Sequence, residues 1–314
     1  MEIHKVVVAG GGVLGSQIAY QAAYCGFDVT IWLRSEGSIG RTQPKLDKLK
    51  EVYRETIEKM ATPAGKSPAV WARGIADAET FDPAACIQKA EQAYAGVKLE
   101  LDMAKAVADA DLIIETMAED VQEKIAFYTK LAPLLPEKTI IVTNSSTLLP
   151  SMFAEHTGRP EKYLSLHFAN TIWRNNTAEV MAQSKTDPRY FDQILAFAND
   201  IRMIALPVRK EKAGYLLNSM LVPLLFSAMD LFVDGVSEPE SIDKAWTLGT
   251  GAPFGPFRIL DTVGLTTAHN IVKTYLHVPE AIAPYHFKAM DEMLSKYIAE
   301  GKLGKSTGEG FYKY

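Results

Sequence analysis

The sequence is poor in cysteine, with only Cys25 and Cys86 among 314 residues. Two cysteines exclude a disulfide framework. Because neither belongs to a Cys-x-x-Cys pair or lies near clustered histidines, we expect reduced thiols and no metal centre. No apolar run approaches the roughly 18 residues that a membrane-spanning helix needs, and we recognise no signal peptide before the first apolar run. We therefore expect a cytoplasmic protein that does not contact a membrane.

A large excess of charge of one sign is also lacking. The chain carries 33 Lys and Arg residues against 38 Asp and Glu residues, a net charge of −5, and no long run of one sign. Nucleic-acid surfaces are basic, so this balance argues against a nucleic-acid partner and favours a small-molecule ligand. Apolar residues make up 47% of the chain, and its length allows two domains that each bury a core.

The N-terminal segment has the pattern of a dinucleotide-binding unit. The β-branched run from Ile3 to Ala9 predicts a strand buried on both faces, a glycine-rich loop follows, and helix is expected from Ser16 to Cys25. A second strand is expected from Asp28 to Leu33. Strand, glycine loop, helix and strand in this order are the context that the motif requires, so we predict a Rossmann-type fold.

The glycine loop is expected to hold the cofactor pyrophosphate. Its first glycine allows a tight turn, its middle glycine lets backbone approach the phosphates, and its last glycine lets the helix pack closely on the strand. The residues assigned to this loop are Gly10, Gly12, Val13, Leu14 and Gly15.

The end of the second strand bears on the choice between NAD and NADP. An acidic residue there would bind the ribose 2′-hydroxyl of NAD, but this chain has Leu33, Arg34 and Ser35 instead. A guanidinium beside a hydroxyl suits a 2′-phosphate, so the sequence favours NADP. The alternative is an exposed arginine beside a permissive NAD site.

Further strands are expected at residues 97–101, 112–116 and 139–143, with helices at 41–60, 83–94 and 121–134. Residues 61–82 read as an inserted loop. The strand at 139–143 runs into Asn144-Ser-Ser-Thr147, a polar cluster at a strand end, where α/β sheets place their ligands. This position makes Ser146 a candidate donor to a substrate oxygen.

The strongest catalytic candidate is a histidine with a carboxylate partner. The apolar run from Tyr163 to Phe168 predicts a strand that brings His167 to its end, and the returning strand 177–181 carries Glu179. A carboxylate beside an imidazole fixes its tautomer and stabilises the imidazolium, which suits a general base for a hydroxyl group. A structural histidine and a solvated glutamate are the alternative.

The pattern changes after a helix expected at 187–200 and a last strand at 202–206. From there only helices are expected, at 214–233, 241–248, 264–276 and 284–299. We therefore predict two domains, a Rossmann-type, doubly wound and mostly parallel α/β sheet at 1–206 and an all-helical domain at 207–314. The helix at 214–233 is apolar on nearly every side, so we expect it to be buried all round, partly against a second copy in a homodimer.

Taken together, these motifs resemble the 3-hydroxyacyl-CoA dehydrogenase family across the whole chain. The spacing from His167 to Glu179, twelve residues (179 − 167), is that of the family. The resemblance implies an NAD(P)-dependent oxidation of an L-3-hydroxyacyl-CoA, with a short acyl chain as in 3-hydroxybutyryl-CoA dehydrogenases. It also implies cofactor contacts from Glu119, Lys124, Asn144 and Asn170, and substrate contacts from Ser146 and Asn218.

Departures from the family pattern leave the substrate open. Ala169 stands where an aromatic residue is usual, Thr171 where proline is usual, and the loop at 173–176 is polar. One alternative is therefore a free 3-hydroxy acid or sugar acid, with Arg174 binding its carboxylate. Another is a nucleotide-binding dimer without turnover, which would need none of Ser146, His167, Glu179 and Asn218.

Overall fold

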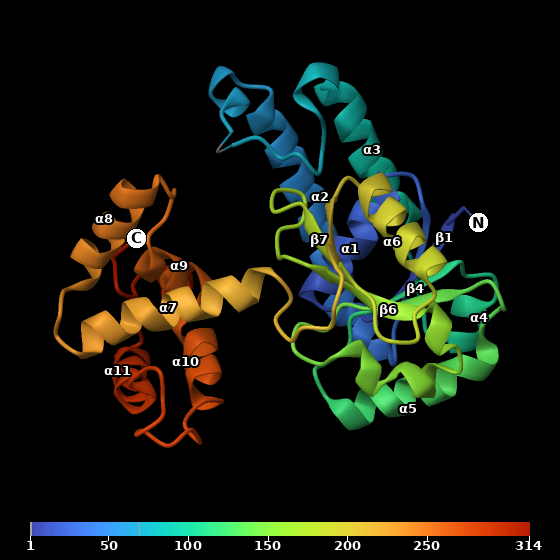
Figure 1. Ribbon diagram of the computed structural model, residues 1–314. Helices are drawn as coiled ribbons and strands as arrows, with labels where there is room; N and C mark the ends of the chain where they lie inside the picture. Colours follow the sequence, from blue (N-terminus) through green and yellow to red (C-terminus); the bar gives the residue numbers. More distant parts are fainter. Residues whose placement is uncertain (1, 69) are drawn as a thin grey trace. The chain divides into compact units, whose positions relative to one another are not determined.

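The computed structural model describes residues 2–68 and 70–314 and contains a single eight-stranded sheet in the order β3-β2-β1-β4-β5-β6-β7-β8 (Figure 1). Its strands are β1 Lys5–Ala9, β2 Asp28–Trp32, β3 Lys98–Glu100, β4 Leu112–Glu115, β5 Ile140–Thr143, β6 Tyr163–Phe168, β7 Thr177–Met181 and β8 Ile204–Val208. Every neighbouring pair is parallel except β6 and β7. The mostly parallel, doubly wound sheet expected from the sequence is confirmed.

Helices cover both faces of this sheet (Figure 1). They are α1 Val13–Tyr24, α2 Glu36–Met60, α3 Pro83–Gly96, α4 Met103–Val107, α5 Val121–Leu131 and α6 Pro188–Asp200. Successive strand residues point to opposite faces. In β1, Val6 and Val8 belong to one core together with Ile18 of α1, whereas Val7 belongs to a second core that includes Phe127 of α5. The continuous apolar runs in the sequence follow from this burial on two sides.

Helix α2 begins earlier than its sequence pattern indicated. The expected start was residue 41, whereas the helix begins at Glu36 and contains Pro44. Glycine and proline in the first turns have low helix propensity, but Leu46, Leu49 and Tyr53 bury one face of the helix in the core. Tertiary packing therefore stabilises the N-terminal turns of α2 despite their low helix propensity.

Residues 61–82 are irregular, as expected, apart from two short 3₁₀ helices, Pro63–Lys66 and Ala78–Thr80. Ala69 lies outside the described residues. The segment packs on the sheet domain, because Ala72 and Ile75 are buried in its core and the Gly74 N–H donates to the Trp173 carbonyl at 3.0 Å. A Cβ on Gly74 would lie 2.8 Å from Trp173 Cα, so glycine is required for this close approach.

The chain divides into two compact units, residues 1–216 and 217–314. This division lies later than the boundary after residue 206 that the sequence indicated. The second unit is helical and comprises α7 Leu217–Val233, α8 Pro239–Thr250, α9 Pro256–Val263, α10 Leu265–Lys273 and α11 Phe287–Ala299. Helix α9 was not expected, although Pro256 at its first position is a recognised start signal.

Helix α7 is only partly buried in the single chain, so the expected burial on all sides, partly against a second copy, stays a prediction. Phe226 and Met229 lie in the core of the second unit, 4% and 1% exposed, but Met220 is 67% exposed. Only part of the helix surface is covered by α9 and α11, with which it packs. In the described residues, no helix is long and apolar enough to span a membrane.

Candidate active site

The polar residues selected from the sequence follow the carboxyl ends of parallel strands. The glycine loop follows β1, Glu119 follows β4, Asn144 and Ser146 follow β5, and His167 lies next to the end of β6. Because these strands run in one direction, their carboxyl ends meet at one edge of the sheet. The fold therefore gathers side chains that lie far apart in the sequence.

At this edge, Ser146, His167 and Glu179 form a chain of hydrogen bonds. His167 and Glu179 are opposite one another in the antiparallel pair β6 and β7, and His167 Nδ1 lies 2.9 Å from Glu179 Oε2. An ionised carboxylate only accepts hydrogen bonds, so Nδ1 carries the proton and Nε2 keeps its lone pair. The Ser146 hydroxyl lies 3.1 Å from Nε2 and donates to it. His167 is 8% exposed and Glu179 4%, so the pair is largely shielded from water.

Residues at the end of the first unit hold this pair in place. The Leu216 N–H donates to Glu179 Oε1 at 2.8 Å, so both carboxylate oxygens have partners. The ring of Tyr215 stacks on His167, with centroids 4.4 Å apart and planes at 13°. Tyr215 adopts a positive φ of 52°, and its buried hydroxyl donates to the Ser145 carbonyl at 2.7 Å. Burial raises the pKa of Tyr215 well above its ordinary value, so the hydroxyl stays protonated and continues to donate.

Glu119 and Asn144 position the loop that carries Ser146. Glu119 accepts from the Ser146 N–H at 2.8 Å and from the Ser145 hydroxyl at 2.7 Å. Asn144 Oδ1 accepts from the Phe168 N–H at 3.0 Å, which joins this loop to the strand bearing His167. Both residues were predicted to contact the cofactor, and the structure gives them this bracing role in the loop.

The glycine loop has the geometry that a pyrophosphate requires. A Cβ on Gly12 would meet nothing within 4 Å, which leaves its backbone accessible. A Cβ on Gly15 would lie 2.3 Å from the Gly10 carbonyl oxygen, so α1 packs against β1 as closely as the motif predicts. Helix α1 begins at Val13 without a side-chain cap, and its first N–H groups are available to an anion. This chain therefore fits a dinucleotide at Gly10, Gly12, Val13, Leu14 and Gly15.

A cavity of about 250 Å³ lies beside this loop. Its lining includes Arg34, one of the two residues that the sequence selected for a 2′-phosphate. The Arg34 guanidinium lies 3.4 Å from a Glu123 carboxylate oxygen, and its side chain is 65% exposed. Ser35 is the N-cap residue of α2, and its hydroxyl lies 3.0 Å from that of Ser38. Arg34 therefore lies at the predicted place but already has an acidic neighbour.

Lys124 lies inside the protein. Its side chain is 1% exposed, and Nζ lies 2.6 Å from Glu115 Oε1, which is itself fully buried. The same carboxylate accepts from the hydroxyls of Tyr128 and Thr143 at 2.9 and 2.7 Å. A lysine chosen for a cofactor contact is thus found in a buried ion pair, and the cofactor contact stays a prediction.

Three further predicted residues lie outside the hydrogen-bonded chain of Ser146, His167 and Glu179. Asn170 is exposed, and its carbonyl accepts from Asn175 Nδ2 at 2.8 Å. Asn218 is the second residue of α7 and belongs to the second unit. Arg174, selected for a free carboxylate, is exposed in the loop between β6 and β7. The roles of these three residues remain predictions.

Comparison with known proteins decides the family. Residues 5–212 match the NAD-binding domain of 3-hydroxyacyl-CoA dehydrogenase, and residues 214–314 match its C-terminal domain. The chain belongs to the 3-hydroxyacyl-CoA dehydrogenase family. The family resemblance inferred from the sequence is confirmed, together with membership of an oxidoreductase family and dependence on NAD(P).

Relatives cover almost the whole length of this dehydrogenase. Human mitochondrial hydroxyacyl-coenzyme A dehydrogenase is 31% identical over 99% of the chain and 91% of its own length. The 3-hydroxybutyryl-CoA dehydrogenase of Clostridioides difficile is 30% identical over 99% of each chain. A solved structure of a diketoreductase, described as acting on dicarbonyl compounds, is 45% identical over 100% of both chains, with a TM-score of 0.85.

Sequence reasoning missed several residues at the site of this dehydrogenase. Tyr215 was assigned only to the apolar helix expected at 214–233. Arg41 and Lys45 fell in the helix expected at 41–60 and were given no role, yet both line the cavity beside the glycine loop. Charge along a helix does not indicate which lysines and arginines turn back toward a neighbouring loop.

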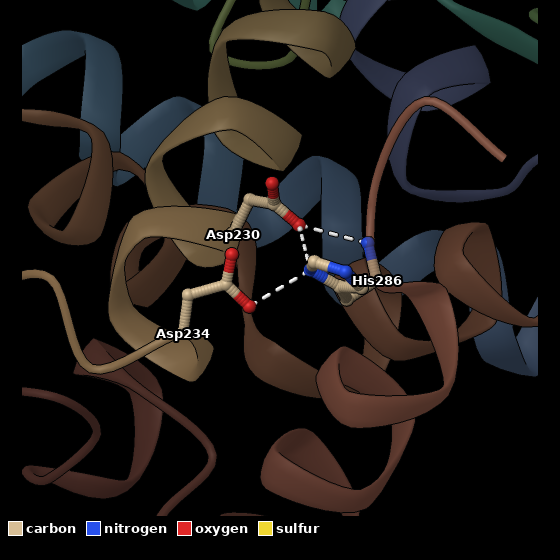
Figure 2. A group of neighbouring side chains, drawn as sticks. All are labelled: Asp230, Asp234 and His286. Atoms are coloured by element: carbon tan, nitrogen blue, oxygen red, sulfur yellow. Dashed lines mark hydrogen bonds and ion pairs between the residues drawn. The ribbon is translucent and has the colours of Figure 1, made fainter. Parts of the chain in front are cut away.

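A separate polar cluster lies in the second unit of the dehydrogenase. Figure 2 shows Asp230, Asp234 and His286, whose potential metal-ligand atoms lie within 4.8 Å of one another. The backbone N–H of His286 donates to Asp230 Oδ1 at 2.8 Å, and the ring Nδ1 of His286 lies 2.8 Å from Asp234 Oδ1. These contacts join Asp230 of α7, and Asp234 just after it, to the N-cap residue of α11.

Proposed function

We propose that this dehydrogenase interconverts an L-3-hydroxyacyl-CoA of short chain length and the corresponding 3-ketoacyl-CoA. The observation that carries the proposal is the hydrogen-bonded chain of Ser146, His167 and Glu179 at the carboxyl edge of a dinucleotide-binding sheet. Family membership supplies the substrate class, since relatives that span the chain carry the names hydroxyacyl- and 3-hydroxybutyryl-CoA dehydrogenase.

His167 is the proposed general base. Its Nε2 bears the lone pair, so it can take the proton of the substrate 3-hydroxyl as a carbonyl forms. The imidazolium that results is stabilised by Glu179, 2.9 Å from Nδ1. In the reducing direction the same imidazolium returns the proton to the oxygen. When bound, the nicotinamide cofactor accepts or supplies the hydride.

Ser146 is proposed to orient the reacting oxygen. Its hydroxyl lies within hydrogen-bond distance of His167 Nε2, so an oxygen bound beside Ser146 is also within reach of the base. Asn218 is proposed as a second donor from the family resemblance alone. Donors that point at the oxygen favour the state in which negative charge grows on it.

NADP(H) is the proposed preferred cofactor, with NAD(H) as the alternative. Support comes from the end of β2, where Leu33 takes the place of the acidic residue that would select NAD and Arg34 follows it. Cofactor contacts from Glu119, Asn144 and Asn170 are part of this proposal. The buried ion pair of Lys124 with Glu115 favours a structural role for that lysine. We also propose a location in the cytoplasm.

Turnover assays test the substrate. We expect reduction of acetoacetyl-CoA with NADPH at a kcat/KM well above that for free acetoacetate, because the nucleotide handle adds binding energy that an acid lacks. The decrease in NADPH absorbance measures the reduction rate with each substrate. Comparable rates with the two substrates, or a preference for the free acid, would overturn the coenzyme A assignment. Either result would favour a free acid whose carboxylate is bound by Arg174.

A second candidate, reduction of dicarbonyl compounds that lack coenzyme A, is favoured by the 45% identity to the diketoreductase. The two candidates share their chemistry, since a 3-ketoacyl thioester is itself a 1,3-dicarbonyl compound. A simple 1,3-diketone such as acetylacetone, assayed beside acetoacetyl-CoA, separates them. Activity on the diketone alone would select this second function and leave the roles of His167 and Glu179 unchanged.

We further propose a homodimer formed by the second unit. Its surface exposes large apolar side chains in a single chain, including Met220 at 67%, Leu248 at 83% and Phe254 at 60%. Sedimentation should give a dimer at micromolar concentration, and Met220→Glu should shift it toward monomer by placing a charge in an apolar contact. Lys244→Glu, which changes an exposed polar residue of α8, serves as the control. A monomeric wild type would refute the dimer.

A further inference from the structure

The cavity beside the glycine loop is lined by three positively charged side chains. Besides Gly10 to Gly12 and the end of β2, its lining includes Arg34, Arg41, Lys45 and a single carboxylate, Glu123. All of these residues belong to the first unit. Three positive side chains against one negative one give the cavity a net positive charge, which favours an anionic ligand.

The single carboxylate lies closest to Arg34. Glu123 Oε2 is 3.4 Å from Arg34 Nη1, and both side chains are largely exposed. An arginine with an acid beside it is partly neutralised before any ligand binds, and the same acid would repel a phosphate placed at Arg34. Arg34 is therefore a poor principal anchor for an anion.

Arg41 has different neighbours. Its Nη2 lies 2.9 Å from the hydroxyl of Ser38, and the Ser38 hydroxyl in turn lies 3.0 Å from that of Ser35. Lys45, one turn along α2, reaches back to the Arg41 carbonyl. Within the part of the chain that the structure describes, Arg41 donates to a hydroxyl and Lys45 to a carbonyl, and no carboxylate is paired with either, so both charges remain available to a ligand.

We infer that Arg41, with Ser38 and Lys45, binds the 2′-phosphate of NADP(H). The inference rests on the proposed function and replaces Arg34 with Arg41 as the anchor of that phosphate. A guanidinium can donate two hydrogen bonds to a phosphate, the Ser38 hydroxyl can donate a third, and the lysine adds a point charge. Arg34 then lines the same cavity without holding the phosphate.

The test measures nucleotide binding and requires no turnover. Calorimetry should show that the wild-type protein binds 2′,5′-ADP more tightly than 5′-AMP, which lacks the 2′-phosphate. Arg41→Gln should weaken 2′,5′-ADP by about tenfold to hundredfold, the contribution of charge-assisted hydrogen bonds, and leave 5′-AMP unchanged. Lys45→Gln should have a smaller effect in the same direction.

Two control variants make the outcome specific. Lys48→Gln removes one positive charge from an exposed position of α2 outside the cavity lining and should leave both affinities unchanged. Arg34→Gln should change the ratio of the two affinities less than Arg41→Gln does. A larger effect of Arg34→Gln, or equal affinities for the two nucleotides in the wild type, would overturn the inference.

Failure of this inference can be told apart from failure of the proposed function. Tight binding of 5′-AMP with no gain from the 2′-phosphate would indicate an NAD-dependent enzyme and leave the His167 mechanism intact. If neither nucleotide nor NADPH binds, the dinucleotide site is lost, and the inference and the proposed function fail together.

Discussion

His167→Ala is expected to lower kcat for acetoacetyl-CoA reduction by about 10²–10⁴-fold, the usual contribution of a positioned acid or base. The Ser146 hydroxyl, which lies 3.1 Å from His167 Nε2, is far too weak a base to replace the imidazole in this variant. Cofactor affinity should change little, because His167 does not line the cavity beside the glycine loop. Stopped-flow turnover and NADPH titration measure the two quantities separately.

Glu179→Gln tests whether the two residues act as a unit. The amide keeps the size of the side chain but cannot stabilise the imidazolium, and it can turn its NH₂ group toward Nδ1 and so favour the wrong tautomer. We expect a large loss in kcat for this variant and little further loss in the double mutant, since residues that work together are not additive. Losses that multiply in the double mutant, or normal turnover by His167→Ala, would contradict the mechanism.

The pairing of His167 with Glu179 could be predicted because sheet geometry is regular. An apolar strand, a loop and a returning strand place residues opposite one another, and the structure pairs these two directly. The strands of the first unit were predicted equally well, since burial on two faces leaves a continuous apolar run. Both are local patterns that need no knowledge of distant packing.

The parts that sequence did not predict depend on long-range packing. Tyr215 reads as one more apolar residue before α7, and only the fold brings its ring onto His167. Gly74 reads as loop, but it lies against Trp173, about 100 residues away in the chain. Lys124 was selected for a cofactor contact, and its buried ion pair with Glu115 at the end of β4 was not foreseen. The roles of Gly74 and Lys124 depend on residues distant in the sequence, and the periodicity of apolar residues does not predict those contacts.

Lys124→Met is expected to lower the free energy of unfolding of the first unit by about 3–5 kcal/mol, the cost of leaving one partner of a buried pair alone. The Glu115 carboxylate would then be held in the core without its cation, and its remaining donors among the described residues are the N–H of Met117 and the hydroxyls of Tyr128 and Thr143. Burial, together with the nearby Glu115 charge, raises the pKa of Tyr128 well above its ordinary value, so this phenol stays protonated and continues to donate. Urea titration monitored by circular dichroism measures the loss.

The double mutant Lys124→Met/Glu115→Gln distinguishes a structural lysine from one that contacts the cofactor. It removes both charges, so it should recover much of the stability that the single mutant loses, and NADPH affinity should stay near the wild-type value. Lys130→Met, at an exposed position of the same helix, is the matched control and should leave the unfolding free energy unchanged to about 0.5 kcal/mol. If Lys124 contacts the cofactor, NADPH will bind more weakly to both the single and the double mutant. Weaker NADPH binding, together with a small change in stability, would show that Lys124 contacts the cofactor. It would also show that the ion pair with Glu115 does not explain the lysine at this position.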